Sequence, residues 1–262
     1  MAEMAWADLF AEQPFAFRFG ARPGDPRRFF NPSADHAVRI RLRQSILAEA
    51  SARHLFQESH SEAAVSELVS WAGLESGGCR ELAQHWEQDF MVLLPDVAGQ
   101  EVFVAGAICF PSSWAPEEKQ GLPVHAIHEP VPTLNQQLGT RIGKFLAGIQ
   151  PGKAWERVNW GLSGSPDLNQ HPARHISPLA PPFELNAVWV RREDQVLFRL
   201  PKTGALIFGI NVVNISVADI AVDPAGRSGL LQALETMPVE IAQYKNLLAA
   251  REELVRALRS AG

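Results

Sequence analysis

The chain has 262 residues, of which 46% are hydrophobic and 20% charged, and its formal net charge is -5. This composition is typical of a globular protein with a substantial core, built as one large domain or two small ones. Acidic and basic residues are interspersed, apart from the short Arg39–Arg41–Arg43 series. A nucleic-acid partner is therefore disfavoured, because such affinity usually depends on clustered Lys and Arg.

Cysteine usage and apolar runs indicate the compartment. Cys79 and Cys109 are far apart and lack CxxC spacing, so neither a disulfide framework nor a structural zinc site is expected. Acidic residues occur early, and no basic segment precedes an apolar run as in a signal peptide. No apolar stretch is long enough to span a bilayer. We therefore expect a cytoplasmic protein without membrane contact.

The first third of the chain predicts an arm followed by helices. Residues 6–30 are rich in Phe, Pro and Gly and predict an irregular arm that lies over a core. Ser33 or Asp35 is expected to cap a helix that continues through about Ala50. Further helices are predicted at Glu62–Trp71 and Cys79–Trp86.

Strand patterns begin near residue 90. Phe90–Leu94 and Glu101–Phe110 are apolar, β-branched runs that predict a hairpin, and helical spacing follows at Leu134–Ile149. The segment Ser163–Pro182 predicts a long surface loop. Three more strands are predicted at Glu184–Arg192, Gln195–Leu200 and Ala205–Val213, with tight turns at Glu193–Asp194 and Pro201–Gly204.

The last segments, Pro224–Glu235 and Pro238–Ser260, are predicted helices. The fold class expected from this order is α+β: a PAS-like antiparallel sheet of about five strands with helical additions at both ends. We expect one domain over residues 1–262, with the arm and helices at about 1–86 and the C-terminal helices at about 224–262.

The segment Ala107–Pro132 contains the best candidate site. It places His125 and His128 three residues apart, just before Pro130-Val131-Pro132. Prolines fix the backbone, so this loop is expected to be rigid. Rigid backbone that holds imidazoles beside apolar surface suits a metal or haem site. The alternative is a pair of loop histidines bonded to nearby carbonyls.

Several short sequence motifs occur in a characteristic order along the chain. They are WEQDFMVLL, AGAICFPSSWAPEEKQG, HAIHEPVP, RVNW, VRREDQVLFRLPKTGALIFGI and the late Tyr244-Lys245. In these motifs and their order, the chain resembles the family of the haem-dependent oxidative N-demethylase α subunit (DUF3445), over roughly residues 15–250.

The resemblance implies a PAS-like core that binds haem b. With O2 and electrons from a separate flavin or iron–sulfur reductase, such a protein oxidises a small methylated amine and releases formaldehyde. It implies His128 as the axial iron ligand, with His125 as the second choice.

Other residues are expected around the haem. Arg157, Asn159 and Trp160 are the further cofactor-binding candidates, because the planar donor fork of arginine suits haem propionates. An ion pair for Arg157 and a core position for Trp160 are the alternatives. Glu193 is the catalytic candidate, as a carboxylate that pairs with an ammonium substrate or relays a proton; the alternative is a solvated turn.

The chain departs from the family pattern at two positions of the last predicted strand. Asn211 and Val213 stand where the family has Arg and Tyr, in a strand expected to line the pocket. These departures favour a second interpretation, a non-catalytic haem or small-ligand sensor. A third is a scaffold subunit that has lost haem and binds a partner through its terminal helices.

Overall fold

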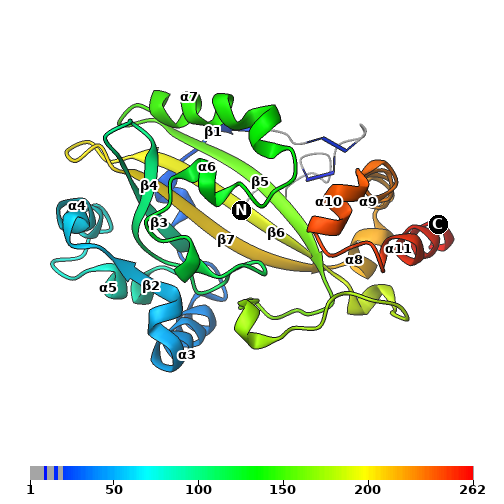
Figure 1. Cartoon of the computed structure of the whole chain (residues 1–262). Helices are drawn as coiled ribbons and strands as arrows, with labels where there is room; N and C mark the ends of the chain where they lie inside the picture. The colour runs from blue at the N-terminus through cyan, green and yellow to red at the C-terminus, as the bar shows by residue number, and fades with distance from the viewer. Residues whose placement is uncertain (1–8, 11–14, 17–19, 262) are drawn as a thin grey trace.

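The computed structural model of the chain describes residues 9–10, 15–16 and 20–261. Residues 6–8, 11–14 and 17–19 of the expected arm lie outside the described residues. The described strands form one antiparallel sheet in the order β1-β5-β6-β7-β3-β4-β2 (Figure 1). They are β1 (Arg22–Pro23), β2 (Leu55–Gln57), β3 (Asp89–Pro95), β4 (Glu101–Ala107), β5 (Ala154–Ser163), β6 (Trp189–Arg199) and β7 (Leu206–Ser216).

Helices lie at both ends of this sheet and over its faces. Helices α6 and α7 cross the face that is turned to the viewer in Figure 1, α3 to α5 lie beside β2, and α8 to α11 gather at the opposite end. The helices are α2 (Pro26–Phe29), α3 (His36–His54), α4 (Glu62–Trp71), α5 (Cys79–His85), α6 (Val124–Ile127), α7 (Thr140–Gly148), α8 (Val217–Val222), α9 (Pro224–Thr236), α10 (Val239–Tyr244) and α11 (Arg251–Ser260).

The predicted α+β class is confirmed, whereas the described sheet has seven strands instead of about five. Five of them are long, β3 to β7, and the break after the second of these is filled by α6 and α7. The two short strands, β1 and β2, pair at the sheet edges over too few residues to leave a sequence pattern. The PAS-like character of the sheet stays a prediction.

The predicted turn at Glu193–Asp194 is wrong, because β6 runs straight through both residues. Glu193 pairs with Asn159 of β5 and Val212 of β7, in the middle of the sheet. Two adjacent acidic residues predicted a turn, because a strand that is covered on both faces is expected to be apolar. Here each carboxylate has its own partners, and Asp194 forms an ion pair with Arg192 at 2.9 Å.

The strand β5 has no counterpart among the predicted strands, and Glu184–Val188 is not a strand. Residues Leu185–Ala187 form a short 3-10 helix before β6. The sequence of β5 mixes aromatic, charged and small residues, so it carries neither an alternating nor a continuous apolar pattern. Pairing with β6 over its full length, Ala154–Ser163, fixes it in the sheet.

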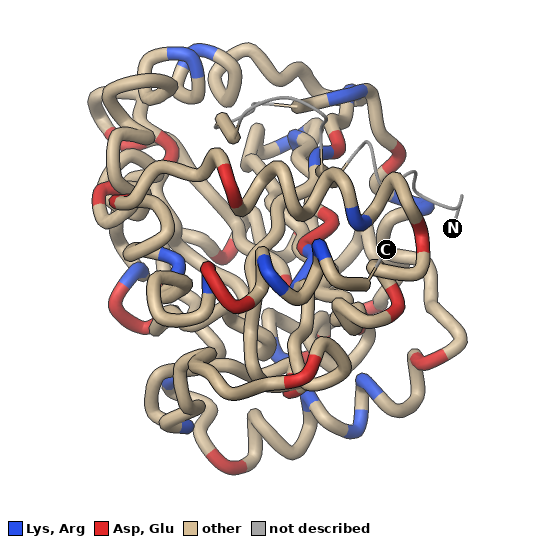
Figure 2. Tube along the Cα trace, turned by 90° about the vertical axis from the view of Figure 1, so that its right-hand side faces the viewer, with Lys and Arg blue, Asp and Glu red and all other residues tan. Residues whose placement is uncertain are grey.

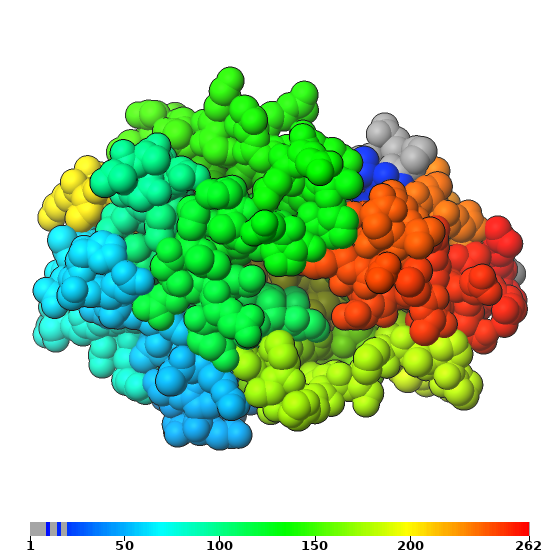
Figure 3. Space-filling view, viewed as in Figure 1, coloured from blue at the N-terminus to red at the C-terminus, as the bar shows by residue number. Residues whose placement is uncertain are grey.

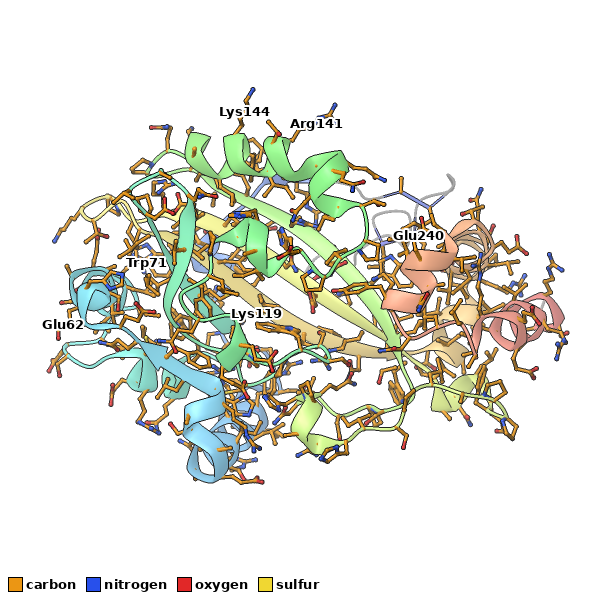
Figure 4. All side chains as sticks on the ribbon, viewed as in Figure 1. Glu62, Trp71, Lys119, Arg141, Lys144 and Glu240 are labelled. Carbon is orange, nitrogen blue, oxygen red and sulfur yellow. The ribbon has the colours of Figure 1, made fainter. Side chains whose placement is uncertain are left out.

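The alternation of β5 and β6 divides the sheet into two faces. We name the side that carries Arg157, Asn159, Arg191, Glu193 and Gln195 the front face. Arg199, on the same side of β6, donates to the Leu146 carbonyl of α7, so this is the face that α6 and α7 cross in Figure 1. Helix α7 covers it with its apolar side, Ile142 and Leu146, while Arg141 and Lys144 point outward to solvent (Figure 4).

The back face is covered by aromatic side chains of the N-terminal half. Phe30 stacks on Trp86 with ring centroids 4.1 Å apart, and Trp71 lies 4.8 Å from Phe198 of β6. Gly209 of β7 makes this cover possible: a Cβ there would lie 2.7 Å from Phe30 Cζ. The back face is therefore closed by core packing at this end of the sheet.

The predicted helix Pro238–Ser260 is two helices. Helix α10 ends at Tyr244, Lys245 caps it, and Asn246 takes a left-handed conformation with φ of 55°. Asn tolerates that conformation better than most residues. This break places Lys245 at the edge of β5, where its Nζ donates a hydrogen bond to the Trp160 carbonyl at 2.8 Å.

Charges of both signs alternate over the end of the molecule formed by α8 to α11 (Figure 2). None of the helices in the described ranges is both long and apolar enough to cross a membrane.

Candidate functional site

The surface of the front face is hollowed beside α6. Figure 3 shows this hollow between the green segment that includes residues 111–132, the orange helix α10, and the yellow-green loop around residues 164–180. Atoms of the central strands are visible at its bottom. We name this region the front hollow. Hydrogen bonds from β6 to Ser112 and to Leu168 confirm that these segments meet over the strand.

His128 lies at the C-terminal end of α6 with an imidazole nitrogen that has no partner. The backbone of His128 donates to the Val124 carbonyl at 3.1 Å, and its carbonyl accepts from Val131 N at 3.0 Å. The side-chain Nδ1 is buried and makes no hydrogen bond. Burial, and then the charge of Arg157, lower the pKa of His128 to about 4. The imidazole is therefore neutral at physiological pH.

His125 differs from His128 in exposure. It lies within α6 and is exposed, and its backbone carbonyl accepts a hydrogen bond from Asn135 Nδ2 at 2.8 Å. Of the two histidines of this segment, only His128 combines burial with an unpaired nitrogen. The front hollow therefore has His128 as its candidate ligand.

Arg157 lies close to His128 on the front face. Its Nε is buried without a hydrogen bond, and no ion pair joins it to a carboxylate in the part of the chain that the structure describes. Burial lowers the pKa of Arg157, and the charge of Glu193 opposes that shift. A buried guanidinium without an anion is unfavourable, so this position suits an anionic ligand.

Glu193 is held by three donors. Ser112 Oγ donates to its Oε1 at 2.5 Å, Gln195 Nε2 to its Oε2 at 2.9 Å, and Asn159 Nδ2 to the same oxygen at 3.3 Å. Three donors hold the carboxylate in one position. This arrangement replaces the solvated turn: Glu193 is a fixed anion on the strand floor of the front hollow.

Arg191 joins the loops that border the front hollow. Its Nε donates to Ser112 Oγ at 2.7 Å, and its Nη2 donates to the carbonyls of Phe110 at 2.7 Å and Leu168 at 2.6 Å. Burial lowers the pKa of Arg191 to about 10, and Glu193 opposes the shift. The side chain is only 3% exposed, so its function is to position Ser112 and both loops.

The C-terminal end of α10 contributes two residues that the sequence did not single out as site residues. Burial lowers the pKa of Lys245, and Glu193 acts in the opposite direction. Burial and then the charge of Glu193 raise the pKa of Tyr244. Contacts bring these residues together. Arg191 and Glu193 share Ser112 Oγ, and Lys245 binds the carbonyl of Trp160, the residue after the Asn159 that donates to Glu193.

Trp160 lies outside this constellation. Its ring packs edge-on against Phe10 at 5.1 Å, on the side of β5 opposite to Arg157 and Asn159. The Trp160 carbonyl, in contrast, binds Lys245. The Lys245 Nζ also lies 5.6 Å from the centroid of the Trp160 ring. Trp160 therefore holds Lys245 through both its carbonyl and its ring, while the ring packs in the C-terminal core.

Asn211 and Val213 do not line the front hollow, contrary to the expectation from the sequence. Val212 lies between them opposite Glu193, so their side chains point to the back face. There the Asn211 Oδ1 accepts a hydrogen bond from Arg39 Nη1 at 3.2 Å. The two positions at which the chain differs from the family pattern therefore lie on the back face of the sheet.

The residues that sequence reasoning missed are Ser112, Arg191, Gln195, Tyr244 and Lys245. Had β6 been recognised as one strand, the alternation of Arg191, Glu193 and Gln195 would have placed them on one face. No local pattern indicated Lys245, because its position depends on the break between α10 and α11.

A family model described as haem-dependent oxidative N-demethylase, alpha subunit-like, matches residues 78–255. The match includes β3 to β7, α6, and the segment with Tyr244 and Lys245. It spans more than half of the chain, so the chain belongs to the haem-dependent oxidative N-demethylase, alpha subunit-like family.

Proposed function

We propose that the front hollow binds haem b, with His128 as the axial ligand, and that the protein demethylates a small methylated amine. The observation that carries this proposal is the buried, unpaired Nδ1 of His128, in a chain of a haem-dependent family. Neutral imidazole is the form that ligates iron.

The residues present fit a haem in three respects. His128 offers an unpaired neutral imidazole, and Arg157 offers a buried cation without an anion. The surrounding segment also supplies apolar side chains that are only partly buried, namely Trp114, Ile127, Leu134 and Leu138. Such side chains are what the porphyrin face requires, and the propionates require cations.

Bound haem supplies the oxidation chemistry. Per turnover, a methylated amine, O2, two electrons and two protons give the demethylated amine, formaldehyde and water. The residues of the chain bind the amine and orient it. Glu193 holds the ammonium form of the amine at its carboxylate and accepts its proton, while Ser112 and Gln195 keep the carboxylate in place.

The remaining expectations become part of this proposal. The electrons come from a separate flavin or iron–sulfur reductase, in agreement with a family named for an alpha subunit. We propose that residues 1–262 act as one domain with a PAS-like sheet, and that the protein is cytoplasmic. Asn159, which also donates to Glu193, stays a cofactor-binding candidate.

Formaldehyde release from a secondary or tertiary amine, with haem-loaded protein and a competent reductase, tests the function. Glu193→Gln keeps the shape but removes the negative charge, so haem binding should persist while formaldehyde release falls at least about a hundredfold. The matched control is Asp194→Asn, because Asp194 is the neighbouring carboxylate and lies on the back face. Full activity of Glu193→Gln would refute the role of this carboxylate.

The sensor interpretation depended on Asn211 and Val213, which face away from the front hollow. The enzymatic proposal is therefore preferred. Haem binding without amine-dependent formaldehyde release in the unmodified protein would select the sensor, and folded protein that takes up no haem would select the scaffold.

A further inference from the structure

The charges around the front hollow are unbalanced. Three cationic groups lie near Glu193: Arg157 on the paired strand β5, Arg191 on β6, and Lys245 at the Trp160 carbonyl. Arg191 needs no anion, because Ser112 Oγ and the backbone carbonyls of two loops accept its hydrogen bonds. The excess positive charge therefore belongs to Arg157 and Lys245.

Neither of these two side chains has a carboxylate within ion-pair distance in the described ranges. Arg157 Nε has no partner, and Lys245 Nζ contacts only neutral groups of Trp160, its carbonyl at 2.8 Å and its ring at 5.6 Å. An ammonium has three donors, so Lys245 retains donors for a ligand. Both charges are partly removed from water, which makes an added anion favourable.

Their positions are separated along β5. Arg157 projects from the front face, and Lys245 meets the strand at Trp160, three residues further. At the rise of an extended strand, three residues span about 10 Å. The two cations therefore meet the strand at separate points, as two carboxylates of one ligand require.

Glu193 lies between these cations and is affected by both. Without a ligand, its negative charge is the one that offsets Arg157 and Lys245. An ammonium that approaches Glu193 then meets two unneutralised positive charges, and like charges oppose its binding. A dicarboxylate that neutralises Arg157 and Lys245 removes this repulsion.

We propose that Arg157 and Lys245 form a two-point dicarboxylate site, and that occupation of this site raises the affinity of Glu193 for an ammonium ligand. This inference rests on the proposed function and assigns to Lys245 the second carboxylate of the haem. Because coupling between two sites is reciprocal, the amine also strengthens dicarboxylate binding.

The first experiment measures binding of iron-free protoporphyrin IX by quenching of tryptophan fluorescence. Iron-free porphyrin has no metal for His128 to ligate. Its affinity therefore depends on the fit of the ring and on its two carboxylates. We expect the diacid to bind at least about tenfold more tightly than its dimethyl ester. Lys245→Met should abolish most of this preference, whereas Lys245→Arg, which keeps the charge, should retain it.

Lys144→Met and Arg141→Met are the matched controls, because both residues are exposed cations on α7 (Figure 4). They should leave the preference for the diacid unchanged. Equal affinity of the unmodified protein for diacid and ester would overturn the two-point site. So would a preference that persists in both Lys245→Met and Arg157→Met.

The second experiment measures the affinity for dimethylammonium by calorimetry, with and without saturating protoporphyrin IX. We expect affinity at least about fivefold higher in the loaded protein, and no such gain with Lys245→Met. Equal affinities would overturn the coupling.

These results are distinguishable from failure of the proposed function. If His128→Ala leaves haemin binding unchanged, iron ligation by His128 fails, but preference for the diacid would still support the two-point site. If neither haemin nor protoporphyrin binds the unmodified protein, both proposals fail.

Discussion

The buried His54 and His171 differ from the half-buried His128 in what their ring nitrogens contact. The Nδ1 atom of His54 lies 2.7 Å from the Ile108 carbonyl, and Nε2 of His171 lies 2.9 Å from Glu117. These contacts satisfy a ring nitrogen of each histidine within the fold, so both histidines have a structural role. The Nδ1 atom of His128 is also buried, but it has no partner. Since a buried polar atom without a partner destabilises a fold, it indicates a ligand that completes the site.

The titration of His128 should be displaced far below that of an ordinary histidine. Its pKa is lowered to about 4, mainly by burial and secondly by Arg157. The unfolded chain takes up this proton near pH 6.5, so protonation favours unfolding between about pH 6.5 and 4. His128 should therefore lower the stability of the ligand-free protein as pH falls through that window.

NMR of the imidazole protons in ligand-free protein measures this titration directly. The His128 signal should stay that of the neutral ring at pH 6. A midpoint of His128 above pH 6 would show that the ring is hydrated, and so would contradict its burial in the front hollow.

Both cysteines should be unreactive in the folded protein. Burial raises the pKa of Cys79 and of Cys109 to about 12, and the two residues are 2% and 0% exposed. The thiolate is the reactive form, so modification by a disulfide reagent at pH 8 should be negligible until the protein is denatured. Rapid modification of either thiol under native conditions would contradict the packing around β4.

At the scale of elements, α3 is tied to the strands through a buried ion pair. Arg43 Nη1 contacts Asp89 Oδ1 at 2.5 Å, and the Asp89 carboxylate accepts from the backbone of Cys109 at 2.7 Å and Phe110 at 2.8 Å. The chain that leaves β4 is thereby fixed just before Ser112. The position of the Glu193 donor thus depends on a contact between a helix and a strand.

Arg43→Met should destabilise the protein by about 3–5 kcal/mol, because it leaves the Asp89 carboxylate buried without its cation. Arg41→Met on the same helix is the control, because Arg41 is exposed and should change stability by about 0.5 kcal/mol or less. Chemical denaturation measures both values. Similar stabilities of the two variants would show that the Arg43–Asp89 pair does not hold α3 to the sheet.

The elements that the sequence predicted well are those with a strong apolar period. Helices Glu62–Trp71 and Cys79–His85 and the hairpin of β3 and β4 were predicted within a few residues. The strand β5 was missed and β6 was divided in two, because both strands carry polar residues toward the front hollow. A functional site on a sheet weakens the period on which strand prediction depends.

Only part of the candidate site could be predicted from the sequence. His128, Arg157 and Glu193 were selected by residue type and by the family resemblance, and the structure brings them together on the front face. Lys245 and Ser112 come from segments far away in the sequence. Their proximity to Glu193 depends on how α10 ends and on how the chain leaves β4, and neither is encoded in a local pattern.

At the scale of the whole molecule, the two faces of the sheet have different roles. The back face is packed with aromatic side chains from the N-terminal half and with the C-terminal helices. The front face is covered incompletely, so charged and polar residues of β5 and β6 remain beneath a hollow (Figure 3). A rigid sheet closed on one side thus supports a site that is open on the other.

Haemin titration followed at the Soret band tests the central claim most directly, with His128→Ala compared with His125→Ala. The account predicts that the unmodified protein and His125→Ala bind haemin with the same spectrum, oxidised and reduced. His128→Ala should lose that spectrum. A protein that stays colourless with haemin, or a His128→Ala variant with an unchanged spectrum, would contradict the assignment of His128 as the iron ligand.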